Sequence, residues 1–191
     1  MTSNRVEAFS DGVIAIIITI MVLEFRPPHV PELAALRPLL PVFVSYAMSF
    51  VFVGIYWSNH HHLFQAVERV NGGVLWANLH LLFWLSLVPF VTAWIGATHF
   101  AAWPVALYGL VLVMAAIAYT IMTRALLSIH AGDSVLATAL GRDFKGKISI
   151  ALNVAAVPLA FVKPWISCAL YVIVAVIWLV PDRRIERTVT G

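Results

Sequence analysis

The stretch RVEAFSDGVIAIIITIMVLE, residues 5–24, decides the fold of this chain. Between Gly12 and Leu23 it holds a single polar side chain, Thr19, and is therefore apolar enough to enter a bilayer as a helix. Asp11 lies at the entrance of this apolar run, where an ionisable group is costly in lipid. An ionisable residue at that depth marks a candidate functional site.

The composition of the whole chain is that of a polytopic membrane protein. Of its 191 residues, 62% are hydrophobic and 11% are charged, whereas a soluble domain carries about 25% charged residues. We expect one domain over residues 1–191. The net charge of +3 belongs to the loops and forms no basic patch, so no nucleic-acid partner is expected. Cys168 is the only cysteine, which excludes an intrachain disulfide.

Six apolar runs predict an all-α membrane protein with six transmembrane helices. Lys163-Pro164 forms a tight turn between the last two runs. The fourth run is expected to face lipid, for instance at Val111. The approximate helices are 5–25, 39–62, 74–95, 101–124, 147–162 and 165–181.

The distribution of basic residues predicts the orientation of these helices. With a cytoplasmic N-terminus, the inner segments hold nine Lys or Arg residues and the outer loops hold three, namely Arg26, Arg37 and Lys163. The excess of positive charge belongs on the cytoplasmic side. Both termini are therefore predicted to be cytoplasmic in a multi-pass protein of the cell (inner) membrane.

The first helix has two chemically different sides. At about 100° per residue, Ile16, Ile20 and Leu23 fall within about 60° of one another and form an unbroken apolar face. Ser10 and Asp11 point away from that face. From the residues alone, Ile16, Ile20 and Leu23 are interpreted as facing lipid or the protein core.

Ser10 and Asp11 permit two interpretations, an ion-attracting mouth or a hydrogen-bonded anchor between helices. Their angular offset from the apolar face favours the anchor. The expected partners lie at the inner end of the second helix, where Trp57 and His61 are four residues apart and share a face. The full set of expected partners is Trp57, Asn59, His60 and His61.

Other chemical functions find little support in the sequence. Consecutive residues point about 100° apart on a helix, so His60, His61 and His62 do not converge on one metal ion. Asn78 and His80 are interpreted as packing or subunit contacts. Nucleophile–base motifs, a phosphate loop and the filter sequence TVGYG are absent, so we expect no enzyme, no metal and no cofactor.

Three motifs resemble the TMEM175 family of lysosomal and prokaryotic potassium channels. Arg5, Phe9, Ser10 and Asp11, followed by GVIAI, are similar to the signature of that family's first helix. The sequence YWSNHH, residues 56–61, resembles the end of its second helix, and Asn78 with SLVPFVT, residues 86–92, resembles its third. Family members often carry Arg where this chain has His62. The motifs cover about the first half of the chain, and the second half is similar in hydropathy.

The resemblance implies a homotetramer that conducts K⁺ down its gradient through a central pore lined by the first helices. It implies stacked apolar constrictions at Ile16, Ile20 and Leu23, with Thr19 beside them. An alternative is a secondary transporter or an accessory membrane protein without conduction. A structural hydrogen-bond network is expected from Arg5, Phe9, Ser10, Asp11, Trp57, Asn59, His60 and His61.

Overall fold

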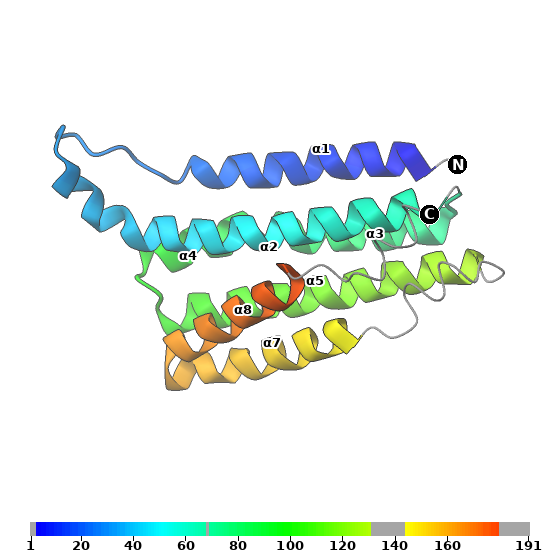
Figure 1. The fold of residues 1–191 in the computed structure, drawn as a ribbon. Helices are drawn as coiled ribbons and strands as arrows, with labels where there is room; N and C mark the ends of the chain where they lie inside the picture. Colours follow the sequence, from blue (N-terminus) through cyan, green and yellow to red (C-terminus); the bar gives the residue numbers. More distant parts are fainter. Residues whose placement is uncertain (1–2, 68, 131–143, 180–191) are drawn as a thin grey trace.

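The computed structural model describes residues 3–67, 69–130 and 144–179 (Figure 1). Its regular elements are helices, and their bounds follow the apolar runs of the sequence. They are α1 (Ser3–Val22), the short 3₁₀ helix η1 (Leu33–Leu39), α2 (Leu40–Gln65), α3 (Gly72–Ser86), α4 (Val88–Ala97), α5 (Ala102–Ile129), α7 (Phe144–Val162) and α8 (Pro164–Leu179).

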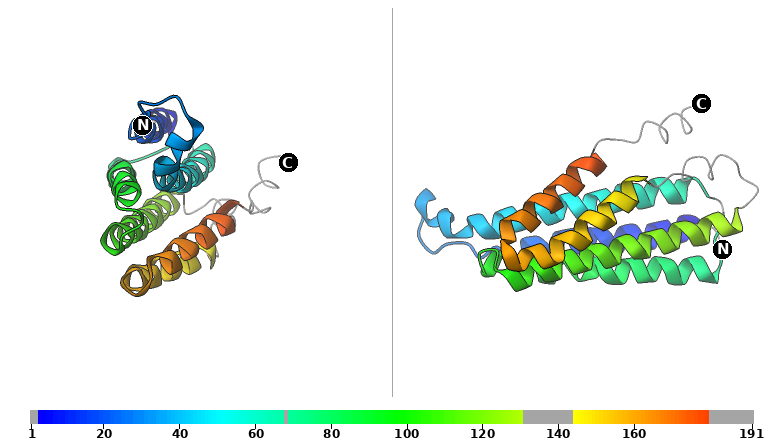
Figure 2. Two further views of the ribbon diagram at one scale, coloured as in Figure 1. Left: turned by 90° about the vertical axis from the view of Figure 1, so that its left-hand side faces the viewer. Right: turned by 90° about the horizontal axis from the view of Figure 1, so that it is seen from below.

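The helices lie side by side and form an elongated bundle (Figures 1 and 2). α1 contacts α2, α3 and α4 at one edge of the bundle. α5 lies in the middle, where it contacts α3, α4, α7 and α8. The α7–α8 hairpin covers the side away from α1, so that α2 lies between α1 and α8 (Figure 2). The first helix is thus held through one side only.

The six predicted helices are confirmed, with differences in the first and the third. The first was predicted over 5–25, but α1 ends at Val22, and Leu23 lies in the turn after it, where its N–H bonds to the carbonyl of Ile20 three residues earlier. The predicted helix 74–95 is two helices, α3 and α4, which meet at Leu87 and together form one apolar rod from Gly72 to Ala97. Pro89 is the physical reason, because it has no N–H group to donate to the carbonyl four residues earlier. Positions 180–181 of the predicted sixth helix lie outside the described residues.

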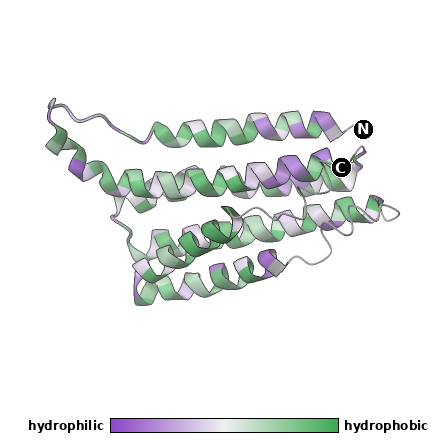
Figure 3. Cartoon of the chain, in the orientation of Figure 1, coloured by the Kyte–Doolittle hydropathy of each residue, from purple (hydrophilic) through white to green (hydrophobic). Residues whose placement is uncertain are grey.

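Four helical stretches among the described residues are long and apolar enough to cross a bilayer, namely Leu33–Gln65, Gly72–Ala97, Ala102–Ile129 and Lys145–Val162. α1 is not among them, and it carries Arg5, Glu7 and Asp11 in its first half. α8 is apolar but shorter, at 16 residues. Figure 3 shows that hydrophilic residues gather at one end of the bundle, where α1 begins and α2 ends. That end therefore belongs at a membrane surface.

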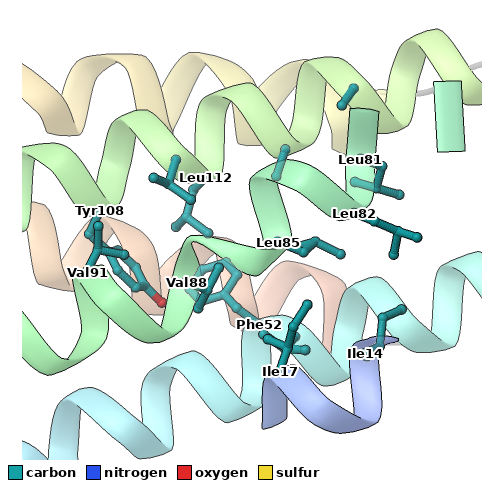
Figure 4. Packing of buried hydrophobic residues seen from close by; sticks show 14 of the residues in the cluster. Ile14, Ile17, Phe52, Leu81, Leu82, Leu85, Val88, Val91, Tyr108 and Leu112 are labelled. Carbon is teal, nitrogen blue, oxygen red and sulfur yellow. The ribbon is translucent and has the colours of Figure 1, made fainter. Parts of the chain in front are cut away.

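The core is built where α5 meets the other layers (Figure 4). Ile14 and Ile17 of α1 pack into the same buried cluster as Phe52 of α2. Val111 is 3% exposed, so the expectation that it faces lipid is wrong. A helix in the middle of the bundle is covered on most sides, and its neighbour Leu110, 44% exposed, lies on the face that remains open.

Two glycines allow helices to approach closely. A Cβ atom at Gly96 would lie 2.8 Å from the Cα of Val42, which shows how tightly α4 packs on α2. A Cβ atom at Gly109 would lie 2.2 Å from the hydroxyl of Tyr171. That hydroxyl donates a hydrogen bond to the carbonyl of Val105 at 2.9 Å. Gly109 therefore makes room for the bond that joins α8 to α5.

We predict that Gly109→Ala lowers the stability of the folded protein by about 1–3 kcal/mol, because the added methyl group displaces the Tyr171 hydroxyl. Gly54→Ala is the matched control, since a Cβ atom there meets nothing within 4 Å. It should be neutral or stabilise by up to about 1 kcal/mol. Thermal melting in detergent measures both, and equal melting temperatures would contradict the assigned packing.

Candidate functional site

α1 is held by a stripe of buried residues on one side. Val6, Ser10, Ile14, Ile17 and Met21 follow one another at intervals of three or four residues and are all buried. This spacing places them on one face of a helix. The face packs on α2, α3 and α4.

The opposite side of α1 is apolar and uncovered within the subunit. Ile16 and Ile20 of α1 are 62% and 45% exposed, and Leu23, in the turn directly after α1, is 73% exposed. Phe9, which is 55% exposed, continues the same line towards the N-terminus. A long exposed apolar line on an otherwise packed helix indicates a surface that lipid or another protein chain covers.

Thr19 is the polar group beside this line. Its hydroxyl lies 2.9 Å from the carbonyl oxygen of Ala15 and 3.1 Å from that of Ile16, and donates within its own helix. The hydroxyl hydrogen is therefore satisfied without a partner from elsewhere. The Thr19 side chain is exposed, so its oxygen lone pairs remain open to the surroundings of the helix.

A buried chain of hydrogen bonds joins α1, α3 and α2 through Asn78. The amide Nδ2 of Asn78 donates to Ser10 Oγ at 2.9 Å, and Ser10 donates to the carbonyl of Val6 at 2.8 Å. The amide Oδ1 of Asn78 lies 2.8 Å from His60 Nε2, which must be the donor because that oxygen only accepts. His60, Asn78 and Ser10 are each at most 2% exposed. The side chain of His60 also stacks on Phe64.

Two further contacts join α1 to α2 nearer the bundle surface. The indole Nε1 of Trp57 donates to Asp11 Oδ1 at 2.9 Å. One turn further towards the polar end of the bundle, His61 Nδ1 lies 2.7 Å from Glu7 Oε1. The His61–Glu7 approach has the distance of an ion pair, but its angles are not those of a hydrogen bond. The ring of Trp57 stacks on that of His61, which ties the two contacts together.

Three residues of the expected network lie elsewhere. The side chain of Asn59 donates to the carbonyl of Ile55 in its own helix and lines a pocket towards α5 and α7. Arg5 and Phe9 are exposed, on the same side of α1 as Ile16. Within the described part of the chain, the Arg5 side chain has no hydrogen-bond or ion-pair partner, and the Phe9 ring carries no group that could form one.

The three consecutive histidines have separate surroundings. His60 is buried against Asn78, His61 faces Glu7, and His62 is exposed. Among the residues that the structure describes, no group of three or more His, Cys, Asp or Glu side chains is arranged to hold a metal ion.

Sequence reasoning missed Glu7 and did not include Asn78 in the hydrogen-bond network. Glu7 lies one helical turn before Asp11, just as His61 lies one turn after Trp57. Because α1 and α2 run antiparallel, these two spacings bring Asp11 opposite Trp57 and Glu7 opposite His61. The sequence spacing alone could therefore have identified Glu7. Asn78 was interpreted as a packing or subunit contact, and its place between Ser10 and His60 depends on how α3 enters the bundle.

These contacts fix the rotation of α1 about its own axis. Ser10 and Asp11, which α1 directs at the bundle, bond to Asn78 on α3 and Trp57 on α2, and Ser10 also donates to a carbonyl within α1. Interhelical polar contacts in membranes contribute about 0.5–2 kcal/mol each. They hold the helix so that its apolar line faces outward.

Comparisons with known proteins agree on one family. Residues 5–89 match the model of the endosomal/lysosomal potassium channel TMEM175. The chain is 55% identical over 188 residues to a potassium channel of Chryseobacterium sp. (strain P1-3), which covers 98% of each chain. It is 39% identical over 128 residues to a potassium channel of Streptomyces collinus, covering 61% of each.

A solved structure extends the likeness to the second half of the chain. The crystal structure of a lysosomal potassium-selective channel TMEM175 homolog from Chamaesiphon minutus superposes with a TM-score of 0.78 at 27% sequence identity. The match covers 95% of this chain and 97% of that one. The α7–α8 hairpin, which no sequence motif identified, therefore belongs to the shared fold.

We predict that Asn78→Leu destabilises the folded protein by about 1–3 kcal/mol, because the buried His60 donor and Ser10 lose their partner. Ser86→Ala on the same helix is the matched control, since its exposed hydroxyl bonds only to the carbonyl of Phe83. That change should stay within about 0.5 kcal/mol. Melting curves in detergent compare the two, and an unaffected Asn78→Leu variant would show that the network contributes no stability.

Proposed function

The chain belongs to the TMEM175 family of channels, and from this premise we propose that it is a potassium-permeable cation channel. Its relatives from Chryseobacterium and Streptomyces are potassium channels, and its structural neighbour is potassium-selective. These are conducting proteins, which supports passive K⁺ movement in preference to catalysis. We propose that conduction needs no cofactor beyond the permeant ion.

We propose that the pore lies between four copies of the chain, with α1 of each copy at the axis. The observation that carries this proposal is the exposed apolar line of Ile16, Ile20 and Leu23, opposite the anchored side of α1. In a closed symmetric ring, one helix from each subunit can enclose a channel that no single subunit contains. The Ser10, Asp11 and Trp57 contacts would then hold each copy in the rotation that the ring needs.

In this arrangement the three aliphatic positions form three stacked rings. Ile16 and Ile20 lie about 6 Å apart along the axis at a rise of 1.5 Å per residue, and Leu23 follows them in the turn after α1. A narrow apolar ring expels water, and a K⁺ ion that loses its water gains no oxygen ligand in return. The rings therefore act as a gate that conducts only when they widen enough to be wetted. Thr19 offers hydroxyl oxygens beside the second ring, and the selectivity of such a neck is expected to be weak.

The polar end of the bundle supports an orientation. The chain is a membrane protein of a channel family, with helices suited to a bilayer. We propose that it lies in the cell (inner) membrane with both termini cytoplasmic, because that orientation gives the inner segments nine Lys or Arg residues and the outer loops three. The anchor at Glu7, Asp11, Trp57 and His61 would then lie near the cytoplasmic entrance.

The alternative, a transporter or an accessory protein that does not conduct, predicts a different assembly. This alternative requires neither a central symmetry axis nor ion flux along the α1 helices. The mass of the purified particle, from light scattering with the detergent contribution subtracted, distinguishes the two. A monomer or dimer would contradict a four-fold pore, and a tetramer without K⁺ flux in liposomes would favour the accessory role.

We predict that Asp11→Asn and Ser10→Ala reduce the stability of the assembly more than they change ion preference, because both residues bond to α2 or α3 on the side away from the apolar line. Thermal dissociation of the oligomer and K⁺/Na⁺ flux ratios in liposomes are measured on the same preparations. An unchanged dissociation temperature with an altered flux ratio would assign these residues to ion selection.

We predict that Ile16→Asn raises basal K⁺ flux and loosens selectivity against Na⁺, because an amide in the ring retains water in the neck. Liposome flux assays with each ion measure the change.

Leu110→Asn is the control for this prediction, since Leu110 is an exposed apolar residue on α5, away from α1. It introduces the same polar group and should leave the flux unchanged. If Ile16→Asn remains folded and tetrameric but its flux equals that of the wild type, Ile16 does not line the path.

A further inference from the structure

His80 lies on the outer side of α3, away from the contacts that hold α1. It follows Asn78 by two residues, which turns it about 200° around the helix from the amide that bonds to α1 and α2. Trp76 and Phe83 share this outer side and are 76% and 56% exposed. Trp76, His80 and Phe83 together form a surface that we call the α3 flank.

The imidazole of His80 has one nitrogen bonded and one open. The indole Nε1 of Trp84 lies 2.9 Å from His80 Nε2, which must accept because an indole N–H only donates. The proton of the neutral ring is therefore on Nδ1. That N–H has no hydrogen-bond partner among the described residues, and the subunit does not enclose it, so a partner can reach it from outside.

This open donor lies at membrane depth. His80 follows Gly72, the first residue of the rod Gly72–Ala97, by eight residues, which places it about 12 Å along the helix from the polar end of the bundle (Figure 3). Lipid chains offer no hydrogen-bond acceptor at that depth, and an unpaired polar group is costly there. Such a donor indicates a contact with another protein chain.

An open acceptor lies on a different flank of the subunit. Asp11 Oδ1 accepts from Trp57 at 2.9 Å, whereas Oδ2 has no partner within the described part of the chain and is not enclosed. From Asp11 round to the apolar line the surface of α1 is uncovered, since Ala15 is exposed and Val22 is 48% exposed. We call this surface the α1–α2 flank; it comprises Asp11, Ala15 and Val22 of α1 with Trp57 and Ser58 of α2.

The proposed four-fold ring brings these two flanks together. The apolar line of α1 faces the axis, and α2 and the α3–α4 rod lie on different sides of α1 (Figure 2). The interface of such a ring is heterologous, so one flank of each subunit meets the other flank of the next. The α3 flank of one copy therefore faces the α1–α2 flank of its neighbour.

The membrane depth of each residue decides which side chains meet across this interface. Rotation about an axis along the membrane normal leaves every residue at its own depth. Ser10, Asn78 and His60 are hydrogen-bonded and share one depth. His80 lies two residues deeper on α3 and Asp11 one residue deeper on α1, a difference of about 1.5 Å. The open donor and the open acceptor are thus at matching depths.

We propose that His80 Nδ1 of each subunit donates a hydrogen bond to Asp11 Oδ2 of the next subunit, with the α3 flank packed on the α1–α2 flank around it. Packed helices lie about 8–10 Å apart, a distance that His and Asp side chains span together. Asp11 then bonds both to Trp57 of its own subunit and to α3 of its neighbour. This inference rests on the proposed four-fold pore.

Cysteine cross-linking of the full chain in membranes tests whether the two flanks meet. Cys168, the only cysteine, is first replaced by Ala. Ala15→Cys and Phe83→Cys are then combined, because each lies about one helical turn deeper than Asp11 or His80 and leaves the proposed bond intact. Treatment with a short bis-maleimide should join subunits into covalent dimers, trimers and tetramers on denaturing gels.

Ala15→Cys combined with Leu110→Cys is the matched control, since Leu110 is exposed on α5, away from α1. This pair and each single cysteine variant should remain monomeric on the same gels. Monomer bands alone from the Ala15→Cys and Phe83→Cys pair, in a particle shown to be tetrameric, would overturn the proposal.

A double-mutant cycle tests the hydrogen bond itself. His80→Leu removes the donor and should raise the dissociation constant of the tetramer about tenfold, measured by energy transfer between labelled subunits as they are diluted in lipid. In an Asp11→Ala background the same change should have less than a twofold effect, because the acceptor is already absent. An equal effect of His80→Leu in both backgrounds would show that Asp11 is not its partner.

Ser58→Ala provides the control background. Ser58 of α2 is the half-buried hydroxyl of the α1–α2 flank, and it lies two residues deeper than His60, at the depth of His80. The full tenfold effect of His80→Leu should persist in this background. Its loss there would assign the donor to Ser58 and overturn the proposed pair.

The contact and the channel function fail in different ways. A tetramer that conducts K⁺ without the cross-link contradicts the contact alone. A tetramer that cross-links but shows no K⁺ flux in liposomes contradicts the channel function alone. A purified monomer contradicts the four-fold pore and, with it, the contact.

Discussion

The structure depends on one constraint, the need of the polar side chains that α1 directs at the bundle to find partners on the neighbouring helices. Ser10 and Asp11 find theirs on α3 and α2, at Asn78 and Trp57. In lipid an unpaired hydroxyl or carboxylate is costly, so the helix has one favourable rotation. That rotation places Ile16 on the outer side. The polar residues of α1 thus determine where its apolar residues point.

The two helices in the middle of the bundle, α5 and α2, make different kinds of contact. α5 is covered by α3, α4, α7 and α8 and supplies much of the core, with Tyr108 and Leu112 fully buried. α2 supplies less core and more polar contacts, since it holds α1 on one face and lines the pocket on another. A movement of α1 in the proposed channel therefore also displaces α2, whereas α5 holds the remaining helices of the subunit together.

The sequence predicted the helices well because hydropathy and helix length are local properties. It also placed Asp11 opposite Trp57, since helical spacing and antiparallel order bring these residues together. It failed where the outcome depends on packing in three dimensions. Val111 and Leu110 are equally apolar, and only the position of α5 in the bundle decides which is buried. The pairing of Asn78 with Ser10 likewise depends on the path of α3.

The anchor also restricts how the proposed gate can open. Rotating α1 alone would carry Ile16 away from the axis, but it would break the Asp11–Trp57 and Ser10–Asn78 contacts. At about 0.5–2 kcal/mol for each contact, the cost over four subunits reaches several kcal/mol. Tilting α1 together with α2 and α3 keeps the Asp11–Trp57, Ser10–Asn78 and His60–Asn78 contacts and still widens the rings. The hydrogen bonds that position the apolar line thus favour opening by a joint movement of α1, α2 and α3.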